Sequence, residues 1–517
     1  MPISPITPDS PFDTVAQRVR AHAQERPDHE ALSDGQMTLT YGELDALMDR
    51  IAHALQRDGV RAGQAIAVCA SGSVRYAALY LGALRAGVVV APLAPSSTAD
   101  TLAAMVSDAQ AQRLFMDSST VDLMPSHAQA RVSLDDSASA QDTDWARWLS
   151  PAGASPDGVE VLPEHAFNII YSSGTTGTPK GIVQSHGMRW AHVRRGAAYS
   201  YRPETRTLLA TPLYSNTTLV VFFPTVAAGG TVVLMSKFDA ATYLHLAQAQ
   251  RITHAMLVPV QFQRLMALPD FDSHDLSSFQ IKFCTSAPFR ADLKADVLAR
   301  WPGGLVEFYG MTEGGGTCIL NAHEHPDKLH TVGKPAPGSE LRLIDEDGHE
   351  LPPGSTGEVV GRSGGMMTGY HGQPEKTREA EWFDVQGQRF IRTGDIGHFD
   401  ADGFLTLMDR RKDMIISGGF NVYPSDLEAK LLGHPAVADV AVVGVPSEAW
   451  GETPVAFLVM RNQAPESADE IKAWYNARAG KTQRLHEAIV LQELPRSAIG
   501  KVLKRELRDT YAQFHQA

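Results

Sequence analysis

Apolar segments of strand length alternate with amphipathic segments of helix length from residue 65 to residue 301. AIAVCAS at 65–71 is followed by RYAALYLGALRAG and then by VVVAPL at 88–93. Parallel strands need a crossover connection, which is usually a helix, so this order is typical of a parallel βαβ unit. Further apolar segments continue the alternation at 113–118, 231–238, 253–259 and 281–288. We therefore predict a large α/β body with a mostly parallel sheet.

The chain changes in character after residue 330. Residues 340–363 and 402–410 alternate apolar and polar side chains around Asp-Gly pairs, which indicates antiparallel strands. Residues 414–517 contain helix, strand, strand and helix patterns and end in a basic segment. We predict an α/β fold in which residues 1–408 form a large N-terminal domain with a β-rich subdomain, and residues 414–517 form a small α+β domain. The polar segment 134–158 is predicted to be a surface loop.

Composition narrows the class of protein. The 517 residues exceed what one ordinary hydrophobic core supports, and 46 basic against 59 acidic residues give a net charge of −13. This balance argues against a nucleic-acid partner. The three cysteines, Cys69, Cys284 and Cys318, are far apart in sequence and form no CxxC pair, which favours a reducing compartment. The N-terminus lacks the features of a signal peptide, and no apolar run is long enough to span a membrane, so we expect a cytoplasmic protein.

One loop stands out for its chemistry. Residues 171–181 read YSSGTTGTPKG, after the apolar strand candidate AFNIIY and before IVQSHGMRW, which could open a helix. Backbone N–H groups in a glycine-rich segment can form an anion-binding concavity, and Lys180 adds a positive charge. The lysine follows proline and precedes glycine, so this is not a Walker A loop. By composition alone, a flexible surface loop is the better interpretation.

Together with other segments, however, the loop resembles the phosphate-binding signature of the adenylate-forming enzymes. This superfamily contains acyl-CoA synthetases, nonribosomal-peptide adenylation domains and beetle luciferases. Five further segments match the family's motifs in the family's order: LTYGELD (39–45), EFYGMTE (307–313), RTGDIG (392–397), DRRKDMIISGGFNVYPSDLE (409–428) and LPRSAIGKVLKREL (494–507). A motif is supported by its context, and ordered matches across most of the chain supply that context.

The resemblance implies a reaction in two halves. A carboxylate attacks the α-phosphate of ATP to give acyl-AMP and pyrophosphate, and a thiol then displaces AMP. ATP, Mg²⁺ and CoA are the implied cofactor and co-substrates, and a small-molecule carboxylic acid is the implied substrate. The residues implied to bind ATP or AMP are Ser172, Ser173, Gly174, Thr175, Thr176, Gly177, Lys180, Ser286, Ala287, Pro288, Tyr309, Gly310, Met311, Asp395 and Arg410.

The family's roles can be carried over to individual residues. In YGMTE, Tyr309 would stack on adenine, Thr312 would donate to the α-phosphate, and Glu313 would bind Mg²⁺, a hard ion that prefers oxygen ligands. Asp395 and Arg410 would contact the ribose. Without the resemblance, a Glu after a Thr is more simply part of a helix cap, and an Asp beside a Gly is more simply a turn residue.

Lys501 is implied to be the catalytic lysine that bridges the substrate carboxylate and the α-phosphate. An isolated lysine in such a basic segment would otherwise be part of a solvated helix face, which is our expectation for Lys504 and Arg505. In this family the C-terminal domain rotates between the half-reactions, so we expect a mobile domain and a hinge at 409–413, centred on Lys412. Gly418, Gly419 and Trp450 are expected near the CoA arm, although Trp450 fits a half-buried core position equally well.

The acyl site is the least determined part. Many relatives have a histidine at its mouth, whereas this chain has Tyr214 and Ser215 there. With Pro259, Gly314 and Gly315, these residues are predicted to line a pocket for an apolar or aromatic acid, and the three-glycine run at 314–316 to leave room for bulk. The motifs look most like those of 4-coumarate/feruloyl-, halobenzoyl- and fatty-acyl-CoA ligases.

Two other functions stay open at this point. The chain could load a separate carrier protein with the acyl group, or it could be a nucleotide-binding relative without catalysis. The oligomeric state is also undetermined, with a homodimer as one option.

Overall fold

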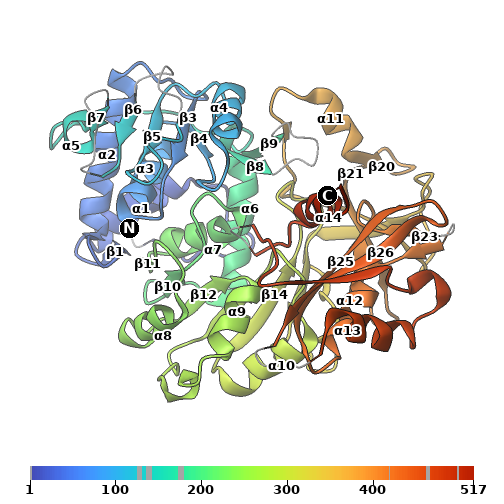
Figure 1. Ribbon diagram of the computed structural model, residues 1–517. Helices are drawn as coiled ribbons and strands as arrows, with labels where there is room; N and C mark the ends of the chain where they lie inside the picture. Colours follow the sequence, from blue (N-terminus) through green and yellow to red (C-terminus); the bar gives the residue numbers. More distant parts are fainter. Residues whose placement is uncertain are drawn as a thin grey trace. The chain divides into compact units, whose positions relative to one another are not determined.

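The computed structural model describes residues 3–124, 131–135, 142–172, 180–417, 420–461, 466–497 and 500–516. The chain divides into two compact units (Figure 1). The first contains residues 1–329, 335–340 and 361–391, and the second contains 330–334, 341–360 and 392–517. The chain thus passes between the units several times between 329 and 392. The predicted boundary at 409–413 lies inside the second unit, and the proposed rotation about it stays a prediction.

Two large sheets form the first unit, where a single one was predicted. The first sheet has the strand order β19 (Gly369–Tyr370), β9 (Lys180–Ser185), β8 (Ala166–Ser172), β4 (Val89–Pro92), β3 (Ala65–Cys69), β5 (Leu114–Met116), β6 (Arg131–Ser133) and β7 (Thr143–Asp144). The second has the order β16 (Lys334–Pro335), β15 (Cys318–Asn321), β14 (Gly304–Tyr309), β13 (Ile281–Cys284), β12 (His254–Leu257), β10 (Arg206–Leu209), β11 (Thr231–Leu234), β1 (Glu30–Ser33) and β2 (Thr38–Thr40). Most neighbours in both are parallel, as predicted.

Helices cover these sheets. They are α1 (Val15–Glu25), α2 (Tyr41–Arg57), α3 (Val74–Arg85), α4 (Ala99–Asp108), α5 (Trp145–Trp148), α6 (His186–Gly196), α7 (Asn216–Ala227), α8 (Ala240–Ala249), α9 (Pro259–Met266), α10 (Ala291–Arg300) and α11 (Pro374–Glu379), with short 3-10 turns at Ala197–Tyr199 and Phe271–Ser273. The largest hydrophobic core gathers α2, α3 and α7 against strands of both sheets. No helix in the described part of the chain is long and apolar enough to cross a bilayer.

The antiparallel β-rich part is also present. Its strands have the order β17 (Ser339–Ile344), β18 (Thr356–Ser363), β21 (Arg389–Phe399) and β20 (Glu381–Phe383), with β22 (Leu405–Arg410) paired to β21. Asp-Gly turns precede β22 and follow β17, as the sequence pattern predicts.

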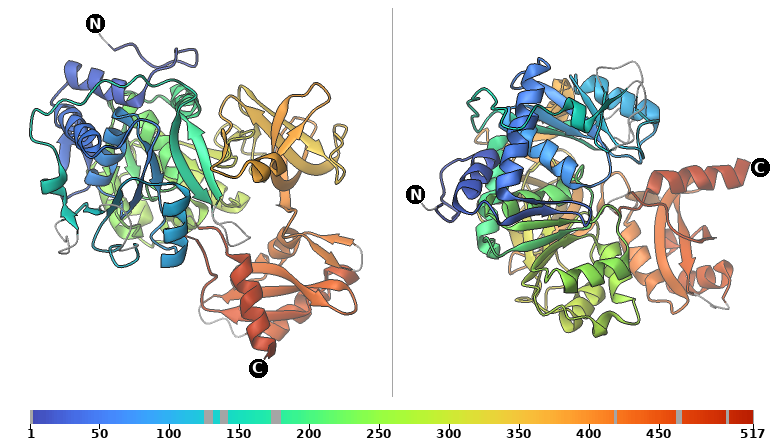
Figure 2. Two further views of the ribbon diagram at one scale, coloured as in Figure 1. Left: turned by 90° about the horizontal axis from the view of Figure 1, so that it is seen from above. Right: turned by 90° about the vertical axis from the view of Figure 1, so that its left-hand side faces the viewer.

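The second unit ends in a small α+β body. Its sheet has the order β24 (Phe420–Val422), β23 (Ile415–Ser417), β26 (Gly451–Met460) and β25 (Val437–Ser447), with β27 (Glu487–Leu491) beside β26. Val440 and Val442 pack with α12 (Pro424–Leu432) and α13 (Ala468–Asn476), while Val443 packs with α14 (Lys504–Gln516). Figure 2 shows α14, the red helix that ends at the C-terminus, beside the orange-red strands of this sheet. Both faces of β25 are therefore buried, which explains its almost continuous apolar run. The fold class is the one predicted.

The prediction of a surface loop at 134–158 is wrong in part. Residues 143–148 form β7 and the short helix α5. Trp145 and Trp148 are buried, and Trp148 packs edge-on against Phe115 with 4.9 Å between the ring centroids. Two indole rings buried this way outweigh the polar residues around them.

Candidate active site

The loop with the YSSGTTGTPKG sequence is held at both of its ends. β8 and β9 are antiparallel neighbours, and Ser172 pairs with Lys180 across them. The Tyr171 hydroxyl donates to the Asp108 carboxylate at 2.7 Å, and the His371 N–H donates to the Gly181 carbonyl at 2.7 Å. Burial and the Asp108 charge raise the pKa of Tyr171, so this hydroxyl stays protonated as a donor. The predicted phosphate contacts Ser173, Gly174, Thr175, Thr176 and Gly177 lie outside the described residues.

The local structure after the loop differs from the expectation of a helix. IVQS belongs to β9, and the helix α6 begins only at His186, where Ser185 caps it by accepting from the Met188 N–H. Ile182 and Val183 pair with Ile170 and Ile169. The β-branched side chains of Ile182 and Val183 favour a strand here. Lys180 is therefore the first residue of a strand, at the end of the loop.

The YGMTE segment follows β14, and its backbone is fixed from three directions. Three consecutive carbonyl oxygens each accept a hydrogen bond: that of Thr312 from Gln184 Nε2 at 2.7 Å, that of Glu313 from the Met367 N–H at 2.7 Å, and that of Gly314 from Ser363 Oγ at 3.1 Å. Carbonyls that are all hydrogen-bonded make a rigid segment. The side chains of Thr312 and Glu313 are thereby carried on a preorganised backbone.

Close backbone packing explains glycine at positions 314 and 315. A Cβ at Gly314 would lie 1.8 Å from the Gly365 carbonyl oxygen, and the residue has φ +71. A Cβ at Gly315 would lie 3.0 Å from the Gly361 carbonyl oxygen. The glycines are required for this contact, and their predicted place in an acyl pocket stays a prediction.

Glu313 and Lys180 approach the same aromatic side chain. The Tyr370 hydroxyl donates to Glu313 Oε1 at 2.8 Å, and Lys180 Nζ lies 5.2 Å from the centroid of the Tyr370 ring. The second oxygen of Glu313 accepts no hydrogen bond from the described residues. An anionic oxygen available in this way is suited to Mg²⁺.

A buried cation supports the same segment. Arg189 of α6 is 1% exposed, and its guanidinium lies 5.8 and 5.9 Å from the ring centroids of Phe167 and Phe223, which pack against each other. Its guanidinium donates to the Gln184 side-chain oxygen, and Gln184 in turn holds Thr312. No carboxylate among the described residues pairs with Arg189. Burial lowers its pKa to about 10, so it is still charged at neutral pH.

The predicted adenine-side loop follows β13. Ser286 has φ +83, a conformation that favours glycine, and its hydroxyl lies 2.6 Å from the Thr217 hydroxyl. Strained residues of this kind gather at functional sites. Ala287, which is part-buried, and Pro288, which is exposed, follow it.

The predicted acyl-site residues have structural roles of their own. Ser215 caps α7 by accepting from the Thr217 N–H, and Pro259 is the first residue of α9, where a missing N–H is harmless. Tyr214 is largely buried, which raises its pKa to about 12. Contacts of these residues with an acyl group stay predictions.

In the second unit, the structure brings the two predicted ribose contacts together. Asp395 of β21 lies opposite Arg410 of β22, and Arg410 Nε is 3.1 Å from Asp395 Oδ1. Two residues of the predicted hinge also form ion pairs: Arg411 pairs with Glu358 at 3.2 Å, and Asp413 pairs with Arg508 of α14 at 3.1 Å.

Lys501 lies on a tight turn. Gly500 before it has φ +76, and the Ser497 N–H donates to the Lys501 carbonyl at 2.8 Å. Its side chain is exposed, as a residue that reaches a ligand must be. Gly418 and Gly419 lie outside the described residues. Lys481 Nζ lies over the ring of Trp450, 5.3 Å from its centroid. The role of Trp450 near CoA stays a prediction.

The expectation of a solvated Lys504 is wrong. Its ammonium lies 3.0 Å from Glu428, and both side chains are mostly buried. This pair fastens α14 to α12, because the first turn of α14 faces the C-terminal core instead of solvent.

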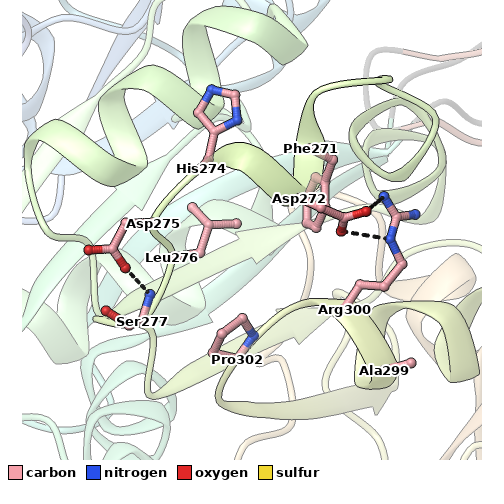
Figure 3. A pocket seen from close by; sticks show the side chains of 9 residues that line it. All are labelled: Phe271, Asp272, His274, Asp275, Leu276, Ser277, Ala299, Arg300 and Pro302. Atoms are coloured by element: carbon pink, nitrogen blue, oxygen red, sulfur yellow. Dashed lines mark hydrogen bonds and ion pairs between the residues drawn. The ribbon is translucent and has the colours of Figure 1, made fainter.

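One cavity of about 470 Å³ lies outside all of these predicted residues (Figure 3). It is lined by Phe271, Asp272, His274, Asp275, Leu276, Ser277, Ala299, Arg300 and Pro302. Arg300 is already neutralised by Asp272, with two contacts of 2.9 and 3.2 Å, and Asp275 accepts from the Ser277 N–H at 3.0 Å. Its charged groups are thus engaged with each other.

Comparison with known proteins identifies the family. The AMP-binding enzyme profile matches residues 19–371, and the profile of the AMP-binding enzyme C-terminal domain matches residues 426–501. The chain belongs to the AMP-binding enzyme family. The prediction of an adenylate-forming enzyme of the acyl-CoA synthetase type is thereby confirmed.

Relatives within the AMP-binding enzyme family match the chain along almost its whole length. A feruloyl-CoA synthase from Amycolatopsis is 33% identical over 94% of this chain and 96% of its own. A fatty acid–acyl-carrier-protein ligase from Streptomyces coeruleorubidus is 32% identical over 97% of each chain. Among solved structures, an amide bond synthetase from Marinactinospora thermotolerans has a TM-score of 0.84 and 27% identity, covering 96% of this chain and 100% of its own.

Three residues of this AMP-binding enzyme were not found by sequence reasoning: Gln184, Arg189 and Tyr370. Their roles depend on contacts that the folded chain makes, so no local sequence motif identifies them. The available signals were polar residues inside otherwise apolar segments, at Gln184 in GIVQS and at Tyr370 in the Gly-Tyr pair of MMTGYHG.

Proposed function

We propose that this chain is an ATP-dependent acid–CoA ligase that converts an apolar or aromatic carboxylic acid to acyl-AMP and then to the acyl-CoA. Pyrophosphate leaves in the first half-reaction and AMP leaves in the second. The observation that carries the proposal is the backbone of residues 312–314, at the end of the YGMTE motif, whose three consecutive carbonyls are held beside Tyr370 and Lys180. A rigid array of donors and charges is what stabilises charge that develops on a phosphoryl group.

Each residue then has a role in the first half-reaction. Lys180 and the loop before it would bind the β- and γ-phosphates, and Thr312 would donate to the α-phosphate. Glu313 would hold Mg²⁺, which supplies charge neutralisation between the phosphates when it is bound. Asp395 and Arg410 would hold the ribose, because an ionised carboxylate accepts from hydroxyl groups. Lys501 would neutralise the oxygens of the attacking carboxylate and of the α-phosphate.

The second half-reaction needs a thiol, and the proposal assigns CoA. The feruloyl-CoA synthase supports both CoA and an aromatic acid. The carrier-protein ligase supports the alternative, in which a separate carrier domain supplies the thiol. We also propose a cytoplasmic location, since Cys69, Cys284 and Cys318 are all buried free thiols, which suits a reducing compartment.

A panel of carboxylic acids tests the proposal. Purified protein is incubated with ATP, Mg²⁺ and CoA, and AMP formation is measured for cinnamic, benzoic and medium-chain fatty acids. AMP that forms with one of these classes and depends on CoA is the expected result. AMP formation with a holo-carrier protein but not with CoA would favour the carrier-loading alternative, and ATP binding without turnover on any acid would favour a non-catalytic relative.

A further inference from the structure

Tyr370 connects two parts of the first unit that lie far apart in sequence. Its ring is 9% exposed and packs with Ile182, Met367 and Ile391. Its backbone is fixed as well, since Tyr370 pairs with Ile182 of β9 and its N–H donates to Thr377 Oγ1 at 2.9 Å. The ring and the backbone of Tyr370 are therefore both held by contacts with the first unit.

The two polar contacts of Tyr370 reach two different motifs. Its hydroxyl donates to Glu313 Oε1 at 2.8 Å, and its ring face lies 5.2 Å from Lys180 Nζ. An ionised carboxylate can only accept, so the hydroxyl is the donor in this hydrogen bond. A donor of this kind fixes one carboxylate oxygen and directs the other away from itself.

We propose that Tyr370 is a positioning residue that orients Glu313 for Mg²⁺ and Lys180 for the phosphates of ATP. This inference rests on the proposed function, because that function gives Glu313 and Lys180 their ligands. Tyr370 would touch neither the metal nor the nucleotide. The hydroxyl acts on the carboxylate, and the ring acts on the ammonium through a cation–π contact.

The two contacts can be separated by substitution. Tyr370→Phe keeps the ring next to Lys180 and removes the hydrogen bond to Glu313. Tyr370→Leu removes both contacts. Tyr41→Phe is a matched control, because the Tyr41 hydroxyl is also buried and bonded, at 3.1 and 2.8 Å, to the carbonyl oxygens of Val226 and Gly230.

The experiment is a titration of ATP binding by calorimetry at a series of Mg²⁺ concentrations, with melting temperatures measured in parallel. For Tyr370→Phe, the Mg²⁺ concentration that gives half-maximal ATP affinity should rise about tenfold, the lower end of what loss of a partner behind a metal ligand causes. At saturating Mg²⁺ its ATP affinity should return to the wild-type value. Tyr370→Leu should stay weaker even there, because Lys180 has lost its ring.

Other results would overturn the inference. An unchanged Mg²⁺ dependence in Tyr370→Phe, or an equal change in Tyr41→Phe, would show that Tyr370 has only a structural role. Wild-type protein that binds no ATP at any Mg²⁺ concentration would overturn the proposed function and this inference together. ATP binding is measured without a carboxylic acid or a thiol. The result therefore does not depend on knowing which acid the enzyme uses.

Discussion

At the scale of single residues, the clearest tests concern two glycines, Gly314 and Gly338, and one lysine, Lys501. Gly314 and Gly338 both have positive φ, at +71 and +76. Gly314 faces a carbonyl oxygen at a distance no Cβ can tolerate, whereas nothing lies within 4 Å of a Cβ at Gly338. The two positions therefore separate backbone strain from steric collision.

Substitution by alanine should distinguish them. Gly338→Ala should cost about 1 kcal/mol of unfolding free energy, which is the usual strain of a left-handed alanine. Gly314→Ala should cost several times more, on the order of 3 kcal/mol or above, because the segment after YGMTE must also move. Urea unfolding of the two variants checks this, and equal losses would contradict the packing described for Gly314.

Lys501 is expected to serve only one half-reaction. Lys501→Ala should lower acyl-AMP formation by about 10²–10³-fold or more, the scale for removing a key electrostatic donor. Thioester formation from supplied acyl-AMP should be largely spared. The control is Lys472→Ala, which removes another lysine of the second unit, one that pairs with exposed Asp469 on its own helix. Near wild-type adenylation by Lys501→Ala would contradict the assignment.

At the scale of elements, β9 and α6 connect the phosphate-loop end to the YGMTE segment. Gln184 and Arg189 are both buried, and their contact was not predictable from the sequence, because it depends on the strand-to-helix turn at Ser185. The prediction of a helix over IVQS placed Gln184 on the wrong element. The existence of β8 and of the helix after it was predictable from apolar pattern, whereas the boundary was not.

A double-mutant cycle tests this pair. Gln184→Leu leaves a buried charge without its main partner and should cost about 3 kcal/mol or more. Gln184→Leu combined with Arg189→Met removes the charge as well, and should be more stable than Gln184→Leu alone. Both variants lose the anchor on Thr312 and should adenylate more slowly than wild type.

The test compares the unfolding free energies of these variants, measured by denaturant titration. A double variant that is less stable than Gln184→Leu would contradict the view that Arg189 is a buried cation satisfied through Gln184. Wild-type adenylation rates in both variants would show that the Thr312 carbonyl needs no anchor.

At the scale of the whole molecule, the sequence predicted the architecture better than the site. Apolar alternation identified the parallel βαβ units, and Asp-Gly turns identified the antiparallel strands. The division of the strands into two sheets was not predictable, because an apolar strand pattern does not indicate which strands pair with each other. The family resemblance singled out Asp395 and Arg410 as expected ribose contacts, a role that stays a prediction, but their ion pair depends on the register of β21 with β22. Tyr370 depends on long-range pairing with β9 in the same way.

Buried histidines make the first unit sensitive to acid. Burial lowers the pKa of His22, His186 and His254 to about 4, against 6.5 in the unfolded chain. Between pH 6.5 and pH 4 the unfolded chain binds protons that the folded chain does not, so stability falls as the pH falls. The loss should approach about 3 kcal/mol per histidine at the lower end of this range.

Urea midpoints measured between pH 7 and pH 4.5 check this dependence. His254→Gln should have a lower midpoint at pH 7, since His254 bonds the Tyr199 carbonyl at 2.8 Å, and a shallower decline toward acid. A decline as steep as in wild type would show that His254 does not contribute to it.

The central claim is that this chain catalyses the formation of acyl-AMP from a carboxylic acid and ATP. The most direct measurement is the exchange of labelled pyrophosphate into ATP, without thiol, in the presence of the acid that gives the highest AMP formation. The account predicts exchange that requires the acid and Mg²⁺ and that is lost in Lys501→Ala. Acid-independent exchange, or none with any acid although ATP binds, would contradict it.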